Sequence, residues 1–272
     1  MRHLPPPWSV LRLPTLACAL IALAGPLASL RAAEQTPPPP ADKPVPAEKA
    51  VPPAADQPSV KNGKDGKPDA GFIAKHESFL KRGKEGPIGV LFLGDSITAG
   101  WAGVKPIWDK HYAAYQPANF GIGGDRTQHV LWRIANGELD GIDPKVVVLM
   151  IGTNNSGSPA EEILKGDEAI IAQIHAKLPK TKLLLLGIFP RGMDPKDEKV
   201  AALRAKLATV NASLAKLDDG KQTRYLDIGP QFLDPAGVLA KDIMPDALHP
   251  NGKGYEIWAT AMQPLLDELM KP

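Results

Sequence analysis

Residues 88–98 read IGVLFLGDSIT, and this stretch sets the expected fold of the chain. Its first six residues are apolar at nearly every position and do not alternate with polar ones. Such a run is typical of a strand that is covered on both faces, as in a parallel sheet. It ends at Gly94-Asp95-Ser96, where apolar residues give way to small and polar ones. The stretch therefore predicts an interior strand followed by a loop that carries chemistry.

Similar apolar runs recur along the chain, and helical patterns separate them. The expected strands after the first are residues 118–120, 146–151, 183–189 and, more weakly, 225–228. Apolar residues at 3.6-residue spacing predict helices near 127–135, 160–178, 198–217 and 255–270. This alternation predicts a three-layer, doubly wound α/β domain over residues 69–272, built on a mainly parallel five-stranded sheet.

Two helix starts are marked by their capping residues. Asp69 precedes a helical pattern that runs from Phe72 to Leu80, so we expect it to cap that helix. Ser158-Pro159 with Glu161 predicts a capping box, with Ser158 as the N-cap of the helix near residue 160.

The chain before residue 69 has a different composition, because it holds 15 of the 29 prolines. Residues 1–33 are typical of an export signal: Arg2 and Arg12 precede the apolar run 13–23, with small residues for cleavage near residue 24 or residue 33. An uncleaved membrane anchor is the alternative, but prolines and charges interrupt the apolar run. Residues 34–68 predict a disordered proline-rich linker. We therefore expect an exported protein, periplasmic or secreted, without stable membrane insertion once the signal is removed.

Charge and cysteine content exclude several classes of partner. The chain has 32 Lys and Arg against 30 Asp and Glu, and the excess lies before residue 70. No nucleic-acid partner is expected, because binding phosphates requires clustered basic residues. Cys18 is the single cysteine, and the histidines lack the spacing of metal ligands. Neither a disulfide framework, a metal site nor another cofactor is expected.

Polar residues follow the expected strands at the edge where doubly wound sheets bind ligands. Ser96 follows the first strand, the glycine-rich loop 121–125 follows the second, and Asn154 follows the third; Asp246 and His249 come near the C-terminus. A serine hydroxyl becomes a nucleophile when a histidine takes its proton and a carboxylate orients that histidine. Backbone N–H groups of a glycine turn and an asparagine amide can then bind the oxyanion.

Each of these residues also has a simpler interpretation. Ser96 could cap the following helix, Asn154 could be a turn residue, and Asp246 could be a helix cap beside a surface His249. The loop 121–125 could bind a nucleotide phosphate, although its spacing is not Gly-x-Gly-x-x-Gly.

Four motifs in a fixed order resemble those of the GDSL or SGNH hydrolase family. They are GDS at 94–96, the glycine loop 121–125, GTN at 152–154 and DALH at 246–249. The segments NFGIGGD (119–125), HVLWR (129–133) and NGEL (136–139) are similar to those of the platelet-activating-factor acetylhydrolase catalytic subunits and their bacterial relatives. The resemblance extends from about residue 88 to the C-terminus and implies a flavodoxin-like fold.

The resemblance also implies a role for each site residue. Ser96 corresponds to the nucleophile, His249 to the base and Asp246 to its orienting partner. The oxyanion hole would consist of the N–H groups of Ser96 and Gly124 and the side chain of Asn154, with the neighbouring Gly123 as the alternative to Gly124. The residue after Asn154 is asparagine, where aspartate is common in the wider family.

The implied function is a serine esterase that hydrolyses short-chain esters, acetyl esters above all, through an acyl-serine intermediate and without a cofactor. Its substrate would be a small-molecule or carbohydrate ester. Ile97 and Leu248 could wall a small acyl pocket or pack in the core. A lysophospholipase or thioesterase of the same family is the alternative, as is a non-catalytic carbohydrate-binding module on the same fold. The sequence leaves the oligomeric state open.

Overall fold

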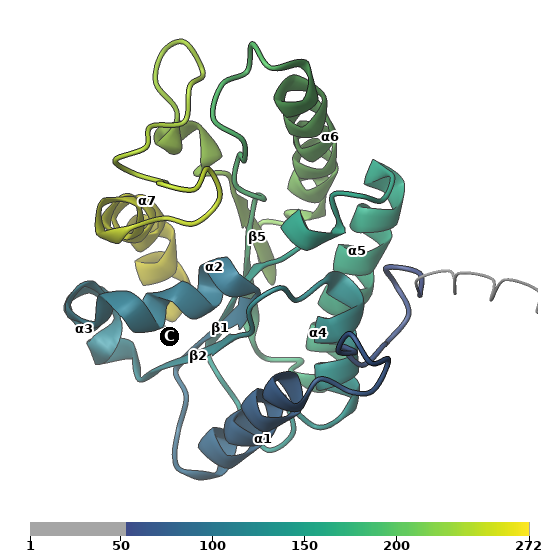
Figure 1. Cartoon of the computed structure of the whole chain (residues 1–272). Helices are drawn as coiled ribbons and strands as arrows, with labels where there is room; N and C mark the ends of the chain where they lie inside the picture. Colours follow the sequence, from purple (N-terminus) through teal and green to yellow (C-terminus); the bar gives the residue numbers. More distant parts are fainter. Residues whose placement is uncertain (1–52, 272) are drawn as a thin grey trace, which may run out of the picture. The chain divides into compact units, whose positions relative to one another are not determined.

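Five parallel strands form the centre of the computed structural model, which describes residues 53–271 (Figure 1). They are β1 (Val90–Gly94), β2 (Pro117–Gly121), β3 (Val146–Met150), β4 (Lys182–Leu186) and β5 (Thr223–Leu226). Their order across the sheet is β2-β1-β3-β4-β5, and all four neighbouring pairs are parallel. The predicted doubly wound α/β fold is confirmed. The predicted signal, residues 1–33, and residues 34–52 of the predicted linker lie outside the described residues.

The three central strands, β1, β3 and β4, are buried on both faces because their side chains alternate between two layers of helices. On one face, Leu91 and Leu93 pack against residues of α1 (Ala70–Lys84), α4 (Thr127–Ala135), α5 (Ala160–Lys177) and α6 (Glu198–Leu214). On the other face, Val90 and Phe92 pack against the segments around α3 (Lys105–Tyr112) and against α7 (Gly252–Met270). Figure 1 shows these two layers on either side of the sheet. The fully apolar run at residues 88–93 is thus explained by two-sided burial.

The order of the strands creates a switch point between β1 and β3. From β1 the chain passes through α2 (Ser96–Ala99) and α3 to reach β2 on one side, and through α4 it returns to β3 on the other. The loops that leave the carboxyl ends of β1 and β3 therefore diverge and leave a crevice between them. Ser96 follows β1 and Asn154 follows β3, so both lie at this crevice.

The helix starts agree with the sequence in one case and differ in the other. The Asp69 carboxylate accepts a hydrogen bond from the Phe72 N–H at 2.7 Å, which confirms it as the cap of α1. The capping box predicted at Ser158 is wrong: α5 begins at Ala160, and extended Pro159 precedes it without a side-chain cap. The Ser158 N–H instead donates to the Asn155 carbonyl at 2.8 Å, within the preceding turn.

Residues 53–68, hereafter the N-terminal strap, pack on the domain although their composition predicted a linker. Ala55 is buried, and its carbonyl accepts a hydrogen bond from the Thr127 hydroxyl at 2.7 Å. The Ser59 N–H donates to the Gln128 carbonyl at 3.0 Å. The packed chain therefore begins before residue 69, because backbone hydrogen bonds to α4 hold a segment with few apolar residues.

The helices within residues 53–271 are each too short or too polar to cross a membrane.

Candidate active site

Ser96 lies at the start of α2, directly after the buried strand β1. Asp95 caps this helix, since its carboxylate accepts a hydrogen bond from the Ile97 N–H at 2.9 Å. Helix α2 approaches β2 closely at Gly121, where a Cβ atom would lie 2.2 Å from the backbone nitrogen of Ala99. Glycine at that position thus lets the helix sit against the sheet edge with half-buried Ser96 at the crevice.

The structure brings Ser96, His249 and Asp246 into one hydrogen-bonded chain. The Ser96 Oγ lies 2.8 Å from the His249 Nε2. The His249 Nδ1 lies 2.6 Å from the Asp246 Oδ2. With a carboxylate facing Nδ1, the imidazole carries its proton there and presents a bare Nε2 to the serine hydroxyl. These distances meet the geometric requirement for a nucleophile, a base and an orienting acid.

The Asp246–His249 turn is shaped by its own backbone. The Asp246 Oδ1 accepts hydrogen bonds from the N–H groups of Leu248 at 3.1 Å and His249 at 2.7 Å. Ala247 adopts a left-handed conformation with φ of 60°, which is uncommon for a non-glycine residue. Although desolvation opposes it, hydrogen bonds from His249 and the backbone keep the pKa of Asp246 below its ordinary value. The carboxylate therefore stays ionised beside the imidazole.

A neighbouring loop holds this turn in place. The Gly192 N–H donates to the Ala247 carbonyl at 2.9 Å. Arg204, on α6, donates to the Gly192 carbonyl at 2.6 Å. Arg191 reaches the other side of the crevice and donates to the Thr153 carbonyl at 3.1 Å. The Asp246–His249 turn is thus anchored by Gly192, in the loop that follows β4.

The glycine loop after β2 passes beside Ser96. A Cβ atom on Gly123 would lie 4.0 Å from the Ser96 Cβ, and Gly124 has a φ of +74°, a conformation that favours glycine. Among residues 53–271, no acceptor takes a hydrogen bond from the N–H of Ser96 or of Gly124. Two backbone donors are therefore available near the serine hydroxyl.

Asn154 follows β3, and its side chain contacts both the loop after β1 and the glycine loop after β2. Its Nδ2 donates to the Asp125 carbonyl at 2.8 Å and lies 3.4 Å from the Asp95 Oδ2. The second contact is long for a hydrogen bond, so one amide proton is only weakly held. Asp95 is buried, and desolvation raises its pKa to about 6. The asparagine amide can thus serve a negatively charged oxygen at the crevice.

A buried ionic cluster of Arg133, Asp125 and Glu138 holds the end of the glycine loop. The Nε of Arg133, on α4, lies 3.0 Å from the Asp125 Oδ2, and Arg133 Nη1 donates to Glu138 and to the Phe120 carbonyl. His76, on α1, contacts Glu138 at 3.2 Å. Burial raises the pKa of Asp125 to about 7, while Arg133 and Lys61 oppose this shift. The single arginine ties the loop to the end of β2 and to the next helix.

Asn155 has a structural role in which its amide both accepts and donates hydrogen bonds. Its Oδ1 accepts from the Thr127 N–H at 3.0 Å, and its Nδ2 donates to the Thr127 hydroxyl at 3.1 Å and to the Gln128 Oε1 at 3.0 Å. A carboxylate has no N–H to donate. The departure from the wider family's aspartate therefore matches the partners that this chain places on α4.

Two residues discussed as pocket walls have different surroundings. Ile97 is only 1% exposed and packs in the core, so it does not line an open pocket. Leu248 is half-buried against the same core. Sequence reasoning assigned no role to Asp95, although it is part of the GDS motif, nor to Lys61, which it placed in the linker. It also gave no role to Arg204, which belongs to none of the motifs.

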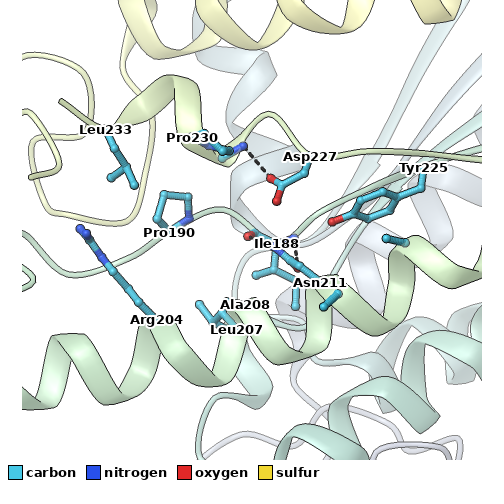
Figure 2. A pocket seen from close by; sticks show the side chains of 13 residues that line it. Ile188, Pro190, Arg204, Leu207, Ala208, Asn211, Tyr225, Asp227, Pro230 and Leu233 are labelled. Carbon is cyan, nitrogen blue, oxygen red and sulfur yellow. Dashed lines mark hydrogen bonds between the residues drawn. The ribbon is translucent and has the colours of Figure 1, made fainter. Parts of the chain in front are cut away.

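An apolar cavity of about 420 Å³ lies where the carboxyl ends of β4 and β5 meet α6 (Figure 2). Leu207 and Ala208 on α6 form one wall, and Pro190 belongs to another. Asn211 exchanges two hydrogen bonds with the backbone of Ile188, so its amide is already satisfied. The triad residues are not among the walls of this cavity.

A second cavity, of about 580 Å³, is lined by polar and apolar groups in about equal measure and opens beside Asn154. Arg126, Gln128, Ser158 and Glu162 line it together with the first residues of the N-terminal strap. Within the described part of the chain, the amide nitrogen of Gln128 donates no hydrogen bond. This cavity thus offers polar groups next to the crevice that holds Ser96.

No group of three or more His, Cys, Asp or Glu side chains is arranged to hold a metal ion within residues 53–271.

Comparison with known proteins identifies the family. Residues 92–257 match the model of the GDSL-like Lipase/Acylhydrolase family. Platelet-activating factor acetylhydrolase IB subunit alpha2 of Rattus norvegicus is 38% identical over 207 residues, which cover 75% of this chain and 86% of the relative. Subunit alpha1 of Bos taurus is 36% identical over 203 residues, covering 74% and 85%.

Solved structures show the same fold. A putative acylhydrolase from Bacteroides fragilis gives a TM-score of 0.60 at 20% identity, covering 72% of this chain and 97% of its own. A GDSL-like lipase from Bacteroides thetaiotaomicron gives 0.58 at 20% identity, covering 72% and 98%. With the family match and the curated relatives, these likenesses show that the chain belongs to the GDSL-like lipase/acylhydrolase family and is a carboxylic ester hydrolase.

Proposed function

We propose that this protein is a serine esterase that removes short acyl groups, acetyl above all, from a hydroxyl-rich alcohol. The observation that carries the proposal is the chain of contacts from Ser96 Oγ through His249 to Asp246, with distances of 2.8 and 2.6 Å. Supporting it, the N–H groups of Ser96 and Gly124 have no acceptor within the described residues, and the Asn154 amide contacts Asp95, which directly precedes the serine.

The proposed reaction has two steps. Ser96 Oγ attacks the ester carbonyl carbon while its proton passes to His249 Nε2, and Asp246 stabilises the resulting imidazolium. The carbonyl oxygen becomes negative and is held by the N–H groups of Ser96 and Gly124 and by Asn154. The tetrahedral intermediate collapses, and the alcohol leaves with the proton from His249. Water then attacks the acyl-serine through the same base and releases the acid.

The acetyl preference rests on the curated relatives, which are 36–38% identical and are named acetylhydrolases of platelet-activating factor. The alcohol preference rests on the polar groups of this chain's own cavity beside Asn154, where Arg126, Gln128 and Ser158 offer hydrogen bonds. A sugar has hydroxyl groups for such donors and acceptors, whereas a lipid tail does not. We therefore favour an acetylated carbohydrate as the substrate.

We also propose that the enzyme acts outside the cytoplasm, on the strength of residues 1–33, with an uncleaved anchor as the alternative. Cell fractionation and N-terminal sequencing of the recovered protein test this: a chain that starts after residue 20 in the periplasm or medium supports export. Recovery of the intact N-terminus in the cytoplasm would contradict it.

The test of the function is product release by the full chain with and without Ser96→Ala. We expect acetate from p-nitrophenyl acetate and acetylated xylan, with a loss of several orders of magnitude in the variant. Equal rates in both proteins would refute the serine mechanism. Faster turnover of lysophospholipids or acyl-thioesters than of acetyl esters would favour the alternative hydrolase activities, and binding of xylan without turnover would favour a carbohydrate-binding module.

A further inference from the structure

Lys61, on the N-terminal strap, reaches the backbone of the glycine loop. Its Nζ donates a hydrogen bond to the Gly123 carbonyl and lies 3.8 Å from the Asp125 Oδ1. The two glycines face different neighbours. A Cβ atom on Gly123 would point at Ser96, whereas one on Gly124 would lie 3.0 Å from the Lys61 Nζ. The loop therefore runs between the serine and the ammonium group.

The Gly123 carbonyl and the Gly124 N–H belong to one peptide group. That peptide is trans, because the described residues contain no cis peptide bond. In a trans peptide the C=O and the N–H point in opposite directions. A donor that holds the carbonyl on one side of the loop therefore fixes the N–H on the other side, and a cation on the carbonyl also polarises that N–H.

We propose that Lys61 is a positioning residue of the oxyanion hole, which holds the Gly123–Gly124 peptide so that the Gly124 N–H faces the reacting carbonyl oxygen. The inference rests on the proposed function, because it assigns a task within that mechanism. Two consecutive glycines can adopt many backbone conformations, so an unheld peptide would rotate away at little cost. The hydrogen bond from Lys61 to the Gly123 carbonyl restricts that rotation.

The N-terminal strap is built to place this lysine. The Asp69 N–H donates to the Lys61 carbonyl at 2.8 Å, and the Ser59 N–H donates to α4 two residues earlier. Val60 packs against the main core. The Lys61 side chain is 24% exposed, so the ammonium is partly shielded from water. Because the backbone on both sides is fixed, the side chain loses little further freedom on binding the carbonyl.

Neutralising Asp125 is the simpler role for Lys61, and the geometry makes it secondary. Asp125 is already paired with Arg133 at 3.0 Å, whereas Lys61 lies 3.8 Å from the other carboxylate oxygen. The direct hydrogen bond of Lys61 goes to the Gly123 carbonyl instead. A purely structural lysine would affect folding stability, and a positioning lysine would affect the chemical step.

The test compares Lys61→Met and Lys61→Arg in the full chain, with Lys64→Met as the matched control. Lys64 is exposed on the same strap and makes no contact with the glycine loop within the described residues. With p-nitrophenyl acetate we expect Lys61→Met to lower kcat about tenfold, which is less than the 10²–10³-fold loss of a direct oxyanion donor. KM and Tm should stay close to those of the unaltered protein.

Lys61→Arg should recover most of the loss, since a guanidinium can also donate to the carbonyl. Lys64→Met should match the unaltered protein. An unchanged kcat in Lys61→Met would overturn the inference, and so would a loss that follows a lowered Tm and is not recovered by arginine. Failure of the proposed function is separate, because it would appear as full activity in Ser96→Ala.

Discussion

The two sides of the crevice are held by different kinds of interaction. The oxyanion side, to which the proposed mechanism assigns Ser96, Gly124 and Asn154, rests on the buried pair of Arg133 and Asp125. The base side, formed by the 246–249 turn, is more exposed: the side chains of Asp246 and His249 are 55% and 41% accessible. One backbone hydrogen bond, from the Gly192 N–H to the Ala247 carbonyl, ties that turn to the 191–193 loop.

This difference matches what each side does in the proposed mechanism. Oxyanion donors act best when they are fixed before the charge develops, so their support must not reorganise during the reaction. A buried ionic cluster provides that rigidity, because breaking it is costly. The imidazole must instead exchange protons with a leaving group and with water, which an exposed turn allows.

The largest effect is expected from a substitution on the base side alone. Asp246→Asn keeps the Oδ1 acceptor of the turn but replaces the oxygen that faces His249 Nδ1. We expect kcat for p-nitrophenyl acetate to fall roughly 10⁴-fold, because the histidine loses its orienting anion. The urea midpoint at neutral pH should fall only slightly, since the residue is exposed. A loss of less than tenfold would show that Asp246 does not orient the base.

The next largest effect is expected when Arg133, which supports the oxyanion side, is replaced. Arg133→Met leaves the carboxylates of Asp125 and Glu138 buried without their cation. We expect the free energy of unfolding, measured in urea, to fall by about 3–5 kcal/mol, with activity falling as the glycine loop loses its anchor. Exposed Arg126→Met on the same loop is the control and should leave stability unchanged. Equal stability of the two variants would contradict the rigid-support interpretation.

The smallest expected effect is on the pH dependence of stability, through Asp95 on the oxyanion side. Burial raises the pKa of Asp95 to about 6 from 3.8, so the unfolded chain releases this proton first as the pH rises. The contribution of Asp95 to stability is therefore complete below about pH 4 and is lost as the pH rises through 6. Asp95→Asn has no such proton and should gain in stability relative to the unaltered protein, by up to about 3 kcal/mol, at pH 8.

Urea unfolding of both proteins at pH 4 and pH 8 measures this difference. If the difference in the free energy of unfolding between Asp95→Asn and the unaltered protein is the same at the two pH values, Asp95 titrates normally. The same experiment with Asp246→Asn supplies the contrast, because hydrogen bonds from His249 and the backbone, against the opposing effect of desolvation, keep that pKa below its ordinary value. Its stability gap should be largest at neutral pH and shrink as the pH falls.

Much of the fold could be predicted because two-sided burial leaves a plain pattern. The run at residues 88–93 became β1, and the apolar stretch at 146–151 became β3, each within two residues. The cap at Asp69 was equally readable, since its hydrogen bond is local. The start of α5 was misplaced by its apparent capping box, because Ser158 is taken up by the turn before it.

The sequence by itself determined the fold class, the strand ends that carry Ser96 and Asn154, and the residue types needed at the site. Only the tertiary structure decided that His249 reaches Ser96 across 153 positions of sequence, and that Arg133 and Arg204 support the two sides. It also decided that the N-terminal strap packs on the domain and brings Lys61 to the glycine loop. Local patterns follow from burial and backbone geometry, whereas contacts between distant polar residues depend on packing that leaves no periodic signal in the chain.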